Sequence, residues 1–499
     1  MEETPDSNSQ PVVGTGIEGL DFILRGGLIQ NRLYLIEGDP GAGKTTLAMQ
    51  YLLAGARRGE RVLFVALSET AEEIRAIAAE HGWSLEGIDL IELRSSEESL
   101  SLEARYTMFH PSEVELNETV KALVAEVERR NPARLVFDSL SELRLLSQNA
   151  LRYRRQILAL KQFFSRRQCT VVLVDDRTAD ESDMHVRSIA HGVIGLERQS
   201  PEYGVTRRRL QVIKIRGWSF QEGYHDFRIV RGGLEVYPRL VASEHFSSFV
   251  RESVPSGLKR LDDLLGGGLA RGTSTLITGS AGTGKSSIAM QYATAGAARG
   301  EVASMFLFDE SIATLLERSA GIGFDVGPLV ESGRLRLRQV NPAELTPGEL
   351  SNAMRKEIEQ HDARLIVIDS LNGYLQSMPS EKLLTIHLHE LLTYLGQKGV
   401  TTLLIMAQHG MVVANETPVD TSYLADTVIL TRFFEALGEV RQAISITKKR
   451  TGVHERAIRE MKLTSGGIII GEPLREFQGV LTGSPVFIGS SFKGASRDE

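Results

Sequence analysis

Short apolar runs alternate along the chain with longer segments that have the apolar spacing of a helix. The strand-like runs are LYLIE at 33–37, RVLFVAL at 61–67, ARLVFD at 133–138 and TVVLVD at 170–175, and TTLAMQYLLAGARR at 45–58 has the helical pattern. Strands separated by helices predict an α/β fold, with a mainly parallel twisted sheet and helices on both faces. Ligands of such sheets bind at the carboxyl ends of the strands.

The same pattern occurs twice in the chain. Aligning the lysines of two glycine-rich loops gives an offset of 285 − 44 = 241 positions, and the match continues without a gap from Gly16 and Gly257 to Trp83 and Phe324. A period of this length is too long for a solenoid repeat and indicates a duplicated domain. The predicted segments are a flexible N-terminal tail, a first domain, a linker, a second domain and a flexible C-terminal tail, at 1–12, 13–242, 243–253, 254–482 and 483–499.

Composition excludes several classes of protein. The net charge of −7 argues against charge-driven binding of nucleic acid. The acidic, polar start MEETPDSNSQ lacks the features of a signal peptide. The apolar run TLLIMA at 402–407 is far shorter than the roughly 20 residues of a membrane span. We therefore expect a cytoplasmic protein with neither a membrane segment nor a nucleic-acid partner, and its single cysteine, Cys169, cannot form an internal disulfide.

Both copies contain the P-loop pattern G-x-x-x-x-G-K-[ST] between a predicted strand and a predicted helix. Glycines let the backbone wrap around a polyphosphate, the lysine reaches the outer phosphates, and the hydroxyl binds Mg²⁺. ATP and Mg²⁺ are therefore the predicted cofactors. The predicted nucleotide-binding residues are Gly38, Gly41, Gly43, Lys44, Thr45 and Thr46 in the first copy and Gly279, Gly282, Gly284, Lys285, Ser286 and Ser287 in the second.

An aspartate ends a later apolar strand in each copy. Asp138 ends ARLVFD and Asp369 ends ARLIVID. A carboxylate at this position helps to hold the Mg²⁺ that bridges the phosphates. The predicted metal ligands are therefore Asp138 with Thr45, and Asp369 with Ser286. The alternative is that each aspartate is only a turn residue at the end of a strand.

A glutamate follows the strand that comes directly after each P-loop helix. Glu69 and Glu310 would face the γ-phosphate, where a carboxylate can orient or deprotonate an attacking water or hydroxyl. The alternative is that they cap the next helix. The preceding residues differ, because Ser68 stands where the second copy has Asp309. Only the second copy therefore has an acidic pair, and we expect the two copies to bind ATP alike but to use it differently.

A lysine and an arginine with one residue between them occur late in each copy. Lys214 and Arg216 end LQVIKIRG, and Lys448 and Arg450 end AISITKKR. Residues two apart on a strand share one face, so each pair suits an anionic ligand. In oligomeric NTPases that ligand is often the triphosphate of a neighbouring subunit. A solvated strand edge is the alternative.

These features together resemble the KaiC-type circadian-clock ATPases of the RecA-like superfamily. The resemblance covers roughly residues 13–488 and includes both P-loops, the strand-end glutamates, the K-x-R pairs, the openings GTGIEGLDFILRGGL and VPSGLKRLDDLLGGGL, and the closing AIREMKLTSGG and LTGSP. It implies two tandem RecA-like P-loop NTPase domains, a hexameric double ring with ATP between subunits, ATPase activity in the N-terminal ring, and Ser/Thr autokinase and autophosphatase activity in the C-terminal ring. It assigns catalytic acids to Glu69, Asp309 and Glu310, and trans-acting cations to Lys214, Arg216, Lys448 and Arg450.

Two departures from the family pattern bear on activity. Ser68 stands where the first domain of the family usually has an acid. In TSYLADT, alignment on Asp426 places Ser422 and Tyr423 at the phosphoacceptor positions, so one Ser is retained and the Thr is replaced by Tyr. The expectation is phosphorylation at Ser422, or at nearby Thr421, in place of a two-site cycle. A simple turn hydroxyl is the alternative for Ser422.

Three functions remain open at the level of sequence. The first is a ring-forming ATPase and autokinase that signals to a KaiB-like protein, a response regulator or another protein partner. The second is a DNA-associated RecA-like motor, against which the loop AQHGMVVANETPVDTSY at 407–423 speaks, because it carries no Lys or Arg. The third is a nucleotide-gated scaffold with little turnover.

Overall fold

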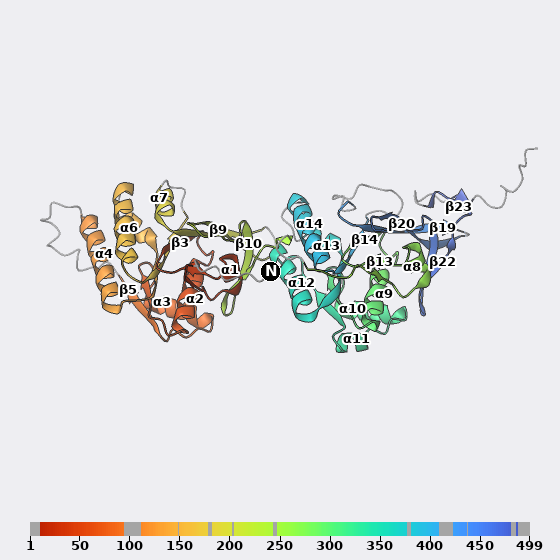
Figure 1. The fold of residues 1–499 in the computed structure, drawn as a ribbon, viewed down its shortest axis with the longest axis horizontal. Coiled ribbons are helices and arrows are strands. Elements are labelled where there is room, and N and C mark those ends of the chain that lie inside the picture. Colours follow the sequence, from red (N-terminus) through yellow and green to blue (C-terminus); the bar gives the residue numbers. More distant parts are fainter. Residues whose placement is uncertain are drawn as a thin grey trace, which may run out of the picture. The chain divides into compact units, whose positions relative to one another are not determined.

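A computed structural model shows two compact units, Met1–Arg239 and Leu240–Glu499 (Figure 1). Each unit contains a nine-stranded sheet. The structure describes residues 10–93, 111–147, 149–177, 182–201, 204–242, 247–376, 381–408, 423–436, 438–480 and 486–487.

The sheet of the first unit is parallel in one part and antiparallel in the other. Strands β8, β3, β7, β6, β4 and β5 pair in parallel in this order, and β9, β10 and β11 extend the sheet beyond β8 as an antiparallel meander. The strands are β3 (Leu33–Gly38), β4 (Val62–Ala66), β5 (Ile88–Glu92), β6 (Arg134–Asp138), β7 (Thr170–Asp176), β8 (Gly192–Gln199), β9 (Arg207–Ile215), β10 (Tyr224–Val230) and β11 (Gly233–Tyr237). A small pair, β1 (Val12–Val13) with β2 (Leu28–Ile29), lies outside this sheet.

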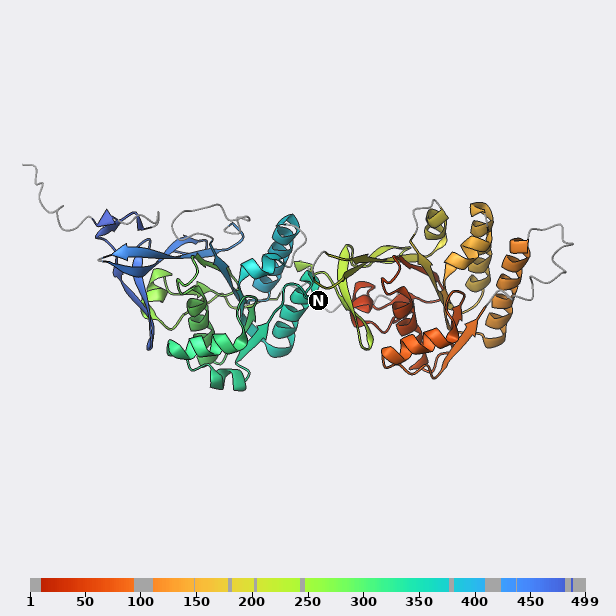
Figure 2. The ribbon, with the colours of Figure 1, turned by 180° about the vertical axis from the view of Figure 1, so that it is seen from behind.

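Helices cover both faces of the first sheet, because its central strands are apolar on both sides (Figures 1 and 2). On β3, Tyr34 and Ile36 belong to a buried cluster with Leu47 of helix α2, whereas Leu33 and Leu35 belong to a second cluster with side chains of α5 and α6. Successive side chains of a strand point to opposite faces, so one strand contributes to two apolar layers. The helices are α1 (Glu18–Ile23), α2 (Lys44–Ala56), α3 (Ala71–Glu80), α4 (Pro111–Arg130), α5 (Leu140–Ser147), α6 (Ala150–Ser165) and α7 (Ser182–Ile189).

The second unit repeats this topology strand for strand. Its sheet has the order β16-β15-β17-β18-β14-β19-β20-β21-β22, with the same parallel and antiparallel pairings as the first. The strands are β14 (Ser274–Gly279), β15 (Val302–Leu307), β16 (Leu335–Gln339), β17 (Ala363–Asp369), β18 (Thr401–Ala407), β19 (Thr427–Ala436), β20 (Glu439–Lys449), β21 (Arg459–Thr464) and β22 (Gly467–Pro473). The predicted α/β fold, with a mainly parallel sheet in each half, is confirmed.

The helices of the second unit also pack on both faces of their sheet. Leu276 and Ile277 are neighbours on β14 but belong to two different buried clusters. The helices are α8 (Lys259–Leu264), α9 (Lys285–Ala298), α10 (Ile312–Gly321), α11 (Gly327–Glu331), α12 (Pro347–His361), α13 (Leu371–Gln376) and α14 (Glu381–Gln397). The short strands are β12 (Ser253–Val254), β13 (Leu269–Ala270), β23 (Phe477–Gln478) and β24 (Val486–Phe487).

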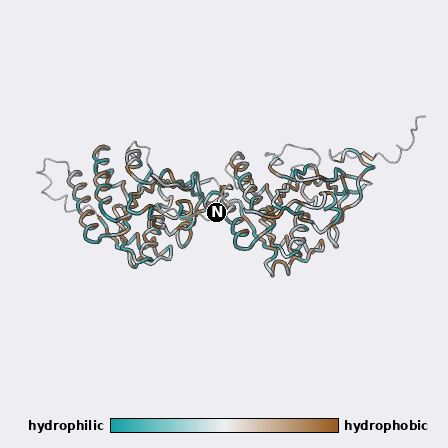
Figure 3. Tube along the Cα trace, viewed as in Figure 1, coloured by the Kyte–Doolittle hydropathy of each residue, from teal (hydrophilic) through white to brown (hydrophobic). Residues whose placement is uncertain are grey.

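Hydrophobic and hydrophilic stretches alternate along the chain in both units (Figure 3). This alternation follows the packing of apolar strands beneath amphipathic helices. Among the described residues, no helix is both long and apolar enough to cross a membrane.

Candidate functional site

Each P-loop lies between the central strand of its sheet and a helix that starts at the loop lysine. Strand β3 ends at Gly38, and α2 begins at Lys44. Gly41 and Gly43 have φ angles of 73° and 104°, a left-handed conformation that a side chain disfavours. The second loop repeats this, because Gly282 and Gly284 have φ angles of 82° and 88°. The conformation turns the loop around the helix N-terminus, as a bound polyphosphate requires.

The first glycine of each loop is required by the sheet itself. A Cβ atom on Gly38 would lie 2.4 Å from the carbonyl oxygen of Leu196 on β8. On Gly279 it would lie 2.1 Å from the carbonyl oxygen of Thr431 on β19. Both distances are shorter than any real Cβ contact, so only glycine fits at the end of these strands.

A hydroxyl at the start of each P-loop helix interacts with the aspartate that ends β6 or β17. Thr45 donates from Oγ1 to Oδ2 of Asp138 over 2.7 Å, and the Ser286 hydroxyl lies near enough to the Asp369 carboxyl to lower its pKa, against the effect of burial. Burial raises the pKa of Asp138 to about 6 and also raises the pKa of Asp369. Both aspartates therefore lie beside the second residue of the helix that follows the P-loop. In both domains the peptide bond after the aspartate is cis.

The two hydroxyl–carboxylate pairs fit a magnesium ion that is completed by phosphate. Mg²⁺ prefers oxygen ligands, and in nucleotide sites it takes one or two from the protein and others from phosphates and water. Within the described part of the chain, no group of three or more His, Cys, Asp or Glu side chains is placed to hold a metal by itself. The residues present thus suit a metal that arrives with a nucleotide.

The strand-end glutamates do not cap the helices that follow them. Thr70 caps α3 through its side chain, which accepts a bond of 3.1 Å from the N–H of Glu73. Ser311 caps α10 in the same way. The capping role considered for Glu69 and Glu310 therefore belongs to the next residue in each copy.

Glu69 and Glu310 occupy equivalent positions but have different surroundings. Oε2 of Glu69 is buried, has no hydrogen-bond partner among the described residues, and burial raises the pKa of this carboxyl. Glu310 instead forms a two-pronged ion pair with Arg318 of α10, with bonds of 3.1 Å and 2.9 Å. Arg318 also donates over 3.4 Å to the hydroxyl of Ser287 on the P-loop helix. At the offset of 241, the first copy has Ile77 in place of Arg318.

The residues before these glutamates make equivalent contacts despite their different chemistry. The Ser68 hydroxyl lies 3.2 Å from the hydroxyl of Ser139. Asp309 accepts a short hydrogen bond from Ser370, the residue equivalent to Ser139. The acid of the second copy thus lies close to Asp369, the predicted metal ligand, and its charge raises the pKa of that aspartate.

The first P-loop lysine has a carboxylate partner that sequence reasoning missed. Asp176, the last residue of β7, forms an ion pair of 2.8 Å with Nζ of Lys44. Its counterpart on β18 is Ala407, since these residues pair with Gly38 and Gly279 respectively. The signal for this partner in the sequence is the acidic end of the apolar run TVVLVDD, which forms the strand next to the P-loop strand.

The basic pair of the first domain lies near the start of the central strand β3, at the end of the sheet away from its own P-loop. Arg216 donates its backbone N–H to the carbonyl of His191, and His191 donates to the carbonyl of Leu33, at the start of β3. The P-loop starts at Gly38, about 16 Å further along at the usual rise of a strand. Lys214 and Arg216 therefore lie far from the P-loop of their own domain.

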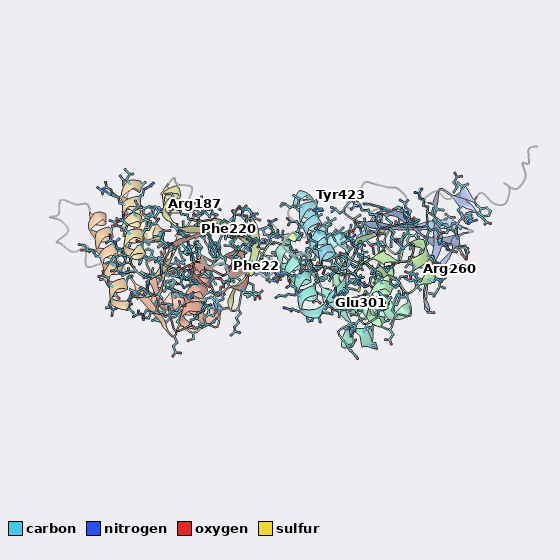
Figure 4. All side chains as sticks on the ribbon, in the orientation of Figure 1. Phe22, Arg187, Phe220, Arg260, Glu301 and Tyr423 are labelled. Atoms are coloured by element: carbon cyan, nitrogen blue, oxygen red, sulfur yellow. The ribbon has the colours of Figure 1, made fainter. Side chains whose placement is uncertain are left out.

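The second domain repeats this separation. Arg450 donates its backbone N–H to Asp426, which donates to Ser274 at the start of β14, whereas the P-loop follows the other end of that strand. The Arg450 side chain pairs with Asp426 over 3.3 Å and donates to the carbonyl of Tyr423 over 2.7 Å. Lys448 is 3.5 Å from the same carbonyl. Tyr423 has an exposed side chain (Figure 4), and Ser422 and Thr421 lie outside the described residues.

The charged groups around the two basic pairs differ. His191 occupies the position that corresponds to Asp426, and burial together with Arg32, Arg216, Lys161 and Lys214 lowers its pKa to about 4. Within the described ranges, no carboxylate is paired with any of these four cations. The first domain thus has a concentration of positive charge where the second has an ion pair.

Comparison with known proteins agrees with this geometry. A family model described as "ATPase: KaiC" matches residues 13–241 and 254–475. The circadian clock protein KaiC3 of Synechocystis is 27% identical, with 96% of this chain and 95% of that protein covered. The circadian clock oscillator proteins KaiC of Parathermosynechococcus lividus and Synechococcus elongatus are 26% and 27% identical, over 98% and 97% of this chain and 92% and 94% of their own length. The chain therefore belongs to the KaiC family of ATPases, with two tandem RecA-like domains.

Proposed function

We propose that both domains bind ATP with Mg²⁺ at their P-loops. The observation that carries this is the contact of Thr45 with Asp138, repeated by Ser286 with Asp369, because it joins the two protein ligands of a nucleotide-bound metal in each domain. When bound, the metal neutralises charge on the phosphates. Lys44 and Lys285 would contact the outer phosphates, while the loop N–H groups hold the chain of phosphates in place.

Replacing the two P-loop lysines tests this proposal. We expect Lys44→Ala and Lys285→Ala each to remove one of two ATP sites per chain, and the double variant to bind none, because each lysine provides the charge that holds the outer phosphates. Equilibrium titration with a fluorescent ATP analogue and Mg²⁺ counts the sites. Lys259→Ala, on an exposed surface of α8, is a matched control and should retain two sites. Two sites in the double variant would contradict the proposal.

We also propose that both domains hydrolyse ATP, with the strand-end glutamates acting on the attacking water. Oε2 of Glu69 is buried without a hydrogen-bond partner among the described residues, and the pKa of this carboxyl is raised. Both properties suit a carboxylate that accepts a proton. In the second domain Asp309 lies beside Glu310, and this acidic pair supports activation of a protein hydroxyl as well as of water. The function is thus an ATPase with serine/threonine autokinase activity in the C-terminal domain.

The far position of the basic pairs supports a ring of identical subunits. A cation about 16 Å along the strand from its own P-loop cannot stabilise charge there, but it can do so at the P-loop of an adjacent copy. We propose a homo-hexamer, the order implied by the family, with nucleotide between subunits. It would signal its nucleotide or phosphorylation state in clock-like regulation to a protein partner of the KaiB or response-regulator type.

Labelling with ATP carrying a marked γ-phosphate tests the kinase proposal. We expect label on Ser422, or on Thr421, because the next residue, Tyr423, contacts Arg450 and Lys448 at the proposed subunit boundary. Mapping of labelled peptides by mass spectrometry identifies the site, and Ser422→Ala or Thr421→Ala should remove it. No label near these residues would leave an ATPase without kinase activity.

A further inference from the structure

The first P-loop lysine has all its hydrogen-bonding capacity in use. Its ammonium donates to the carbonyl oxygens of Gly38 and Asp39, both over 3.0 Å, and pairs with Oδ1 of Asp176 over 2.8 Å. A lysine ammonium has three N–H donors, so these three acceptors saturate it. No donor is left for a phosphate oxygen unless the ammonium gives up one of these three contacts.

The second domain lacks this arrangement. Lys285 donates to the carbonyl of Ser280 over 2.7 Å, and within the described residues no carboxylate lies at ion-pair distance from it. Ala407 stands at the position of Asp176, and it has no charged group. The second lysine is therefore open to a phosphate and the first is not.

Among the three partners of Lys44, only the carboxylate can leave. Gly38 belongs to the central strand β3, and the Asp39 carbonyl follows it in the loop, so both acceptors are fixed by the backbone. The Asp176 side chain is 43% exposed, its other contact is a long bond of 3.4 Å from the Ser141 hydroxyl, and it can rotate into solvent. Its neighbour Asp175 is buried and held by Arg144 and Ser141, so it cannot take over the contact.

We propose that Asp176 competes with the triphosphate for Lys44 and thereby lowers the nucleotide affinity of the first domain. This inference rests on the proposed binding of ATP at both P-loops. A triphosphate that enters the first site must displace the Asp176 carboxylate from Lys44. The negative charge of that carboxylate then remains near the phosphates and repels them. No such step is needed at the second site. The two P-loops share a motif, yet the first is the weaker site.

The test uses the full-length chain with the second P-loop disabled by Lys285→Ala. In that background a fluorescent ATP analogue with Mg²⁺ reports the first site alone. We expect Asp176→Asn to bind it more tightly, on the order of fivefold, which is the scale of a partly exposed ion pair. When Lys44→Ala is added to this background we expect no binding at either site, and Asp176→Asn should not restore it, because its effect requires the Lys44 ammonium.

The reciprocal exchange tests the same idea in the other domain. With the first P-loop disabled by Lys44→Ala, Ala407→Asp should weaken binding at the second site by a similar factor, whereas Ala407→Asn should not. Circular dichroism confirms that each variant is folded.

The outcomes separate this inference from the proposal on which it rests. Unchanged or weaker binding by Asp176→Asn, with clear binding by its parent, would overturn the competition while leaving ATP binding intact. No binding at the first site in either protein would overturn both the competition and the first-domain ATP site.

Discussion

Replacing Arg216 with alanine should lower ATP hydrolysis by the first domain about 10³-fold while leaving ATP bound. An arginine that contacts the transferred phosphate from a neighbouring subunit acts mainly on the transition state, and its loss costs about 10³–10⁵-fold in rate. The measurement is phosphate release at saturating ATP in a Glu310→Gln background, which removes the contribution of the second domain. Arg207→Ala, at the opposite end of β9, is the matched control and should retain the rate.

Mixing experiments show whether Arg216 acts between subunits. Arg216→Ala keeps an intact P-loop, and Lys44→Ala keeps an intact arginine, so mixed rings contain some sites with both groups. We expect activity to reappear when the two inactive variants are combined. If the mixture stays as inactive as its components, the placement of Arg216 at an adjacent subunit's nucleotide is wrong.

Replacing the strand-end glutamates should have the second large effect. Glu69→Gln and Glu310→Gln each remove a carboxylate that accepts a proton, a role worth about 10²–10⁴-fold, while keeping the shape of the side chain. Phosphate release is compared in single and double variants. We expect each single variant to lose the turnover of its own domain and the double variant to be almost inactive.

The contact of Glu310 with Arg318 provides a control within the second domain. Arg318→Ala keeps the carboxylate but removes its two-pronged partner. If Glu310 acts through its carboxylate, Arg318→Ala retains measurable turnover that Glu310→Gln abolishes. Equal phosphate release by wild type and Glu310→Gln would instead support a nucleotide-gated scaffold in that domain.

Much of the fold was predictable because it depends on local patterns. The alternation of apolar strands and helices predicted the α/β sheet, and the ungapped offset of 241 predicted that it occurs twice. The P-loops and strand-end carboxylates were also readable, because each stands at a motif position or at the end of a strand. The contact of Thr45 with Asp138 then follows from where two strands of the same sheet end.

The contacts that distinguish the two sites were not predictable. Asp176 reaches Lys44 only because β7 pairs with β3 in a register that aligns Asp176 with Gly38. Arg318 lies in the last turn of α10, eight residues after Glu310, and no sequence motif connects the two. The sequence alone predicted a difference between the domains at Ser68 and Asp309. The structure shows two further differences, which are these charged contacts. Strand register and side-chain orientation decide them, and neither is visible in residue spacing.

The tight fit of Gly38 against β8 affects how the P-loop motif can be used as a marker. A backbone carbonyl of the adjacent strand excludes any side chain there, with or without a nucleotide. A descendant of this domain that had lost ATP binding would be released from the need for Lys44 and Thr45, but not from the need for this glycine. In a survey of decayed or pseudo-enzymatic copies, the first glycine of the motif would therefore record ancestry, and only the lysine and hydroxyl would record a nucleotide site still in use.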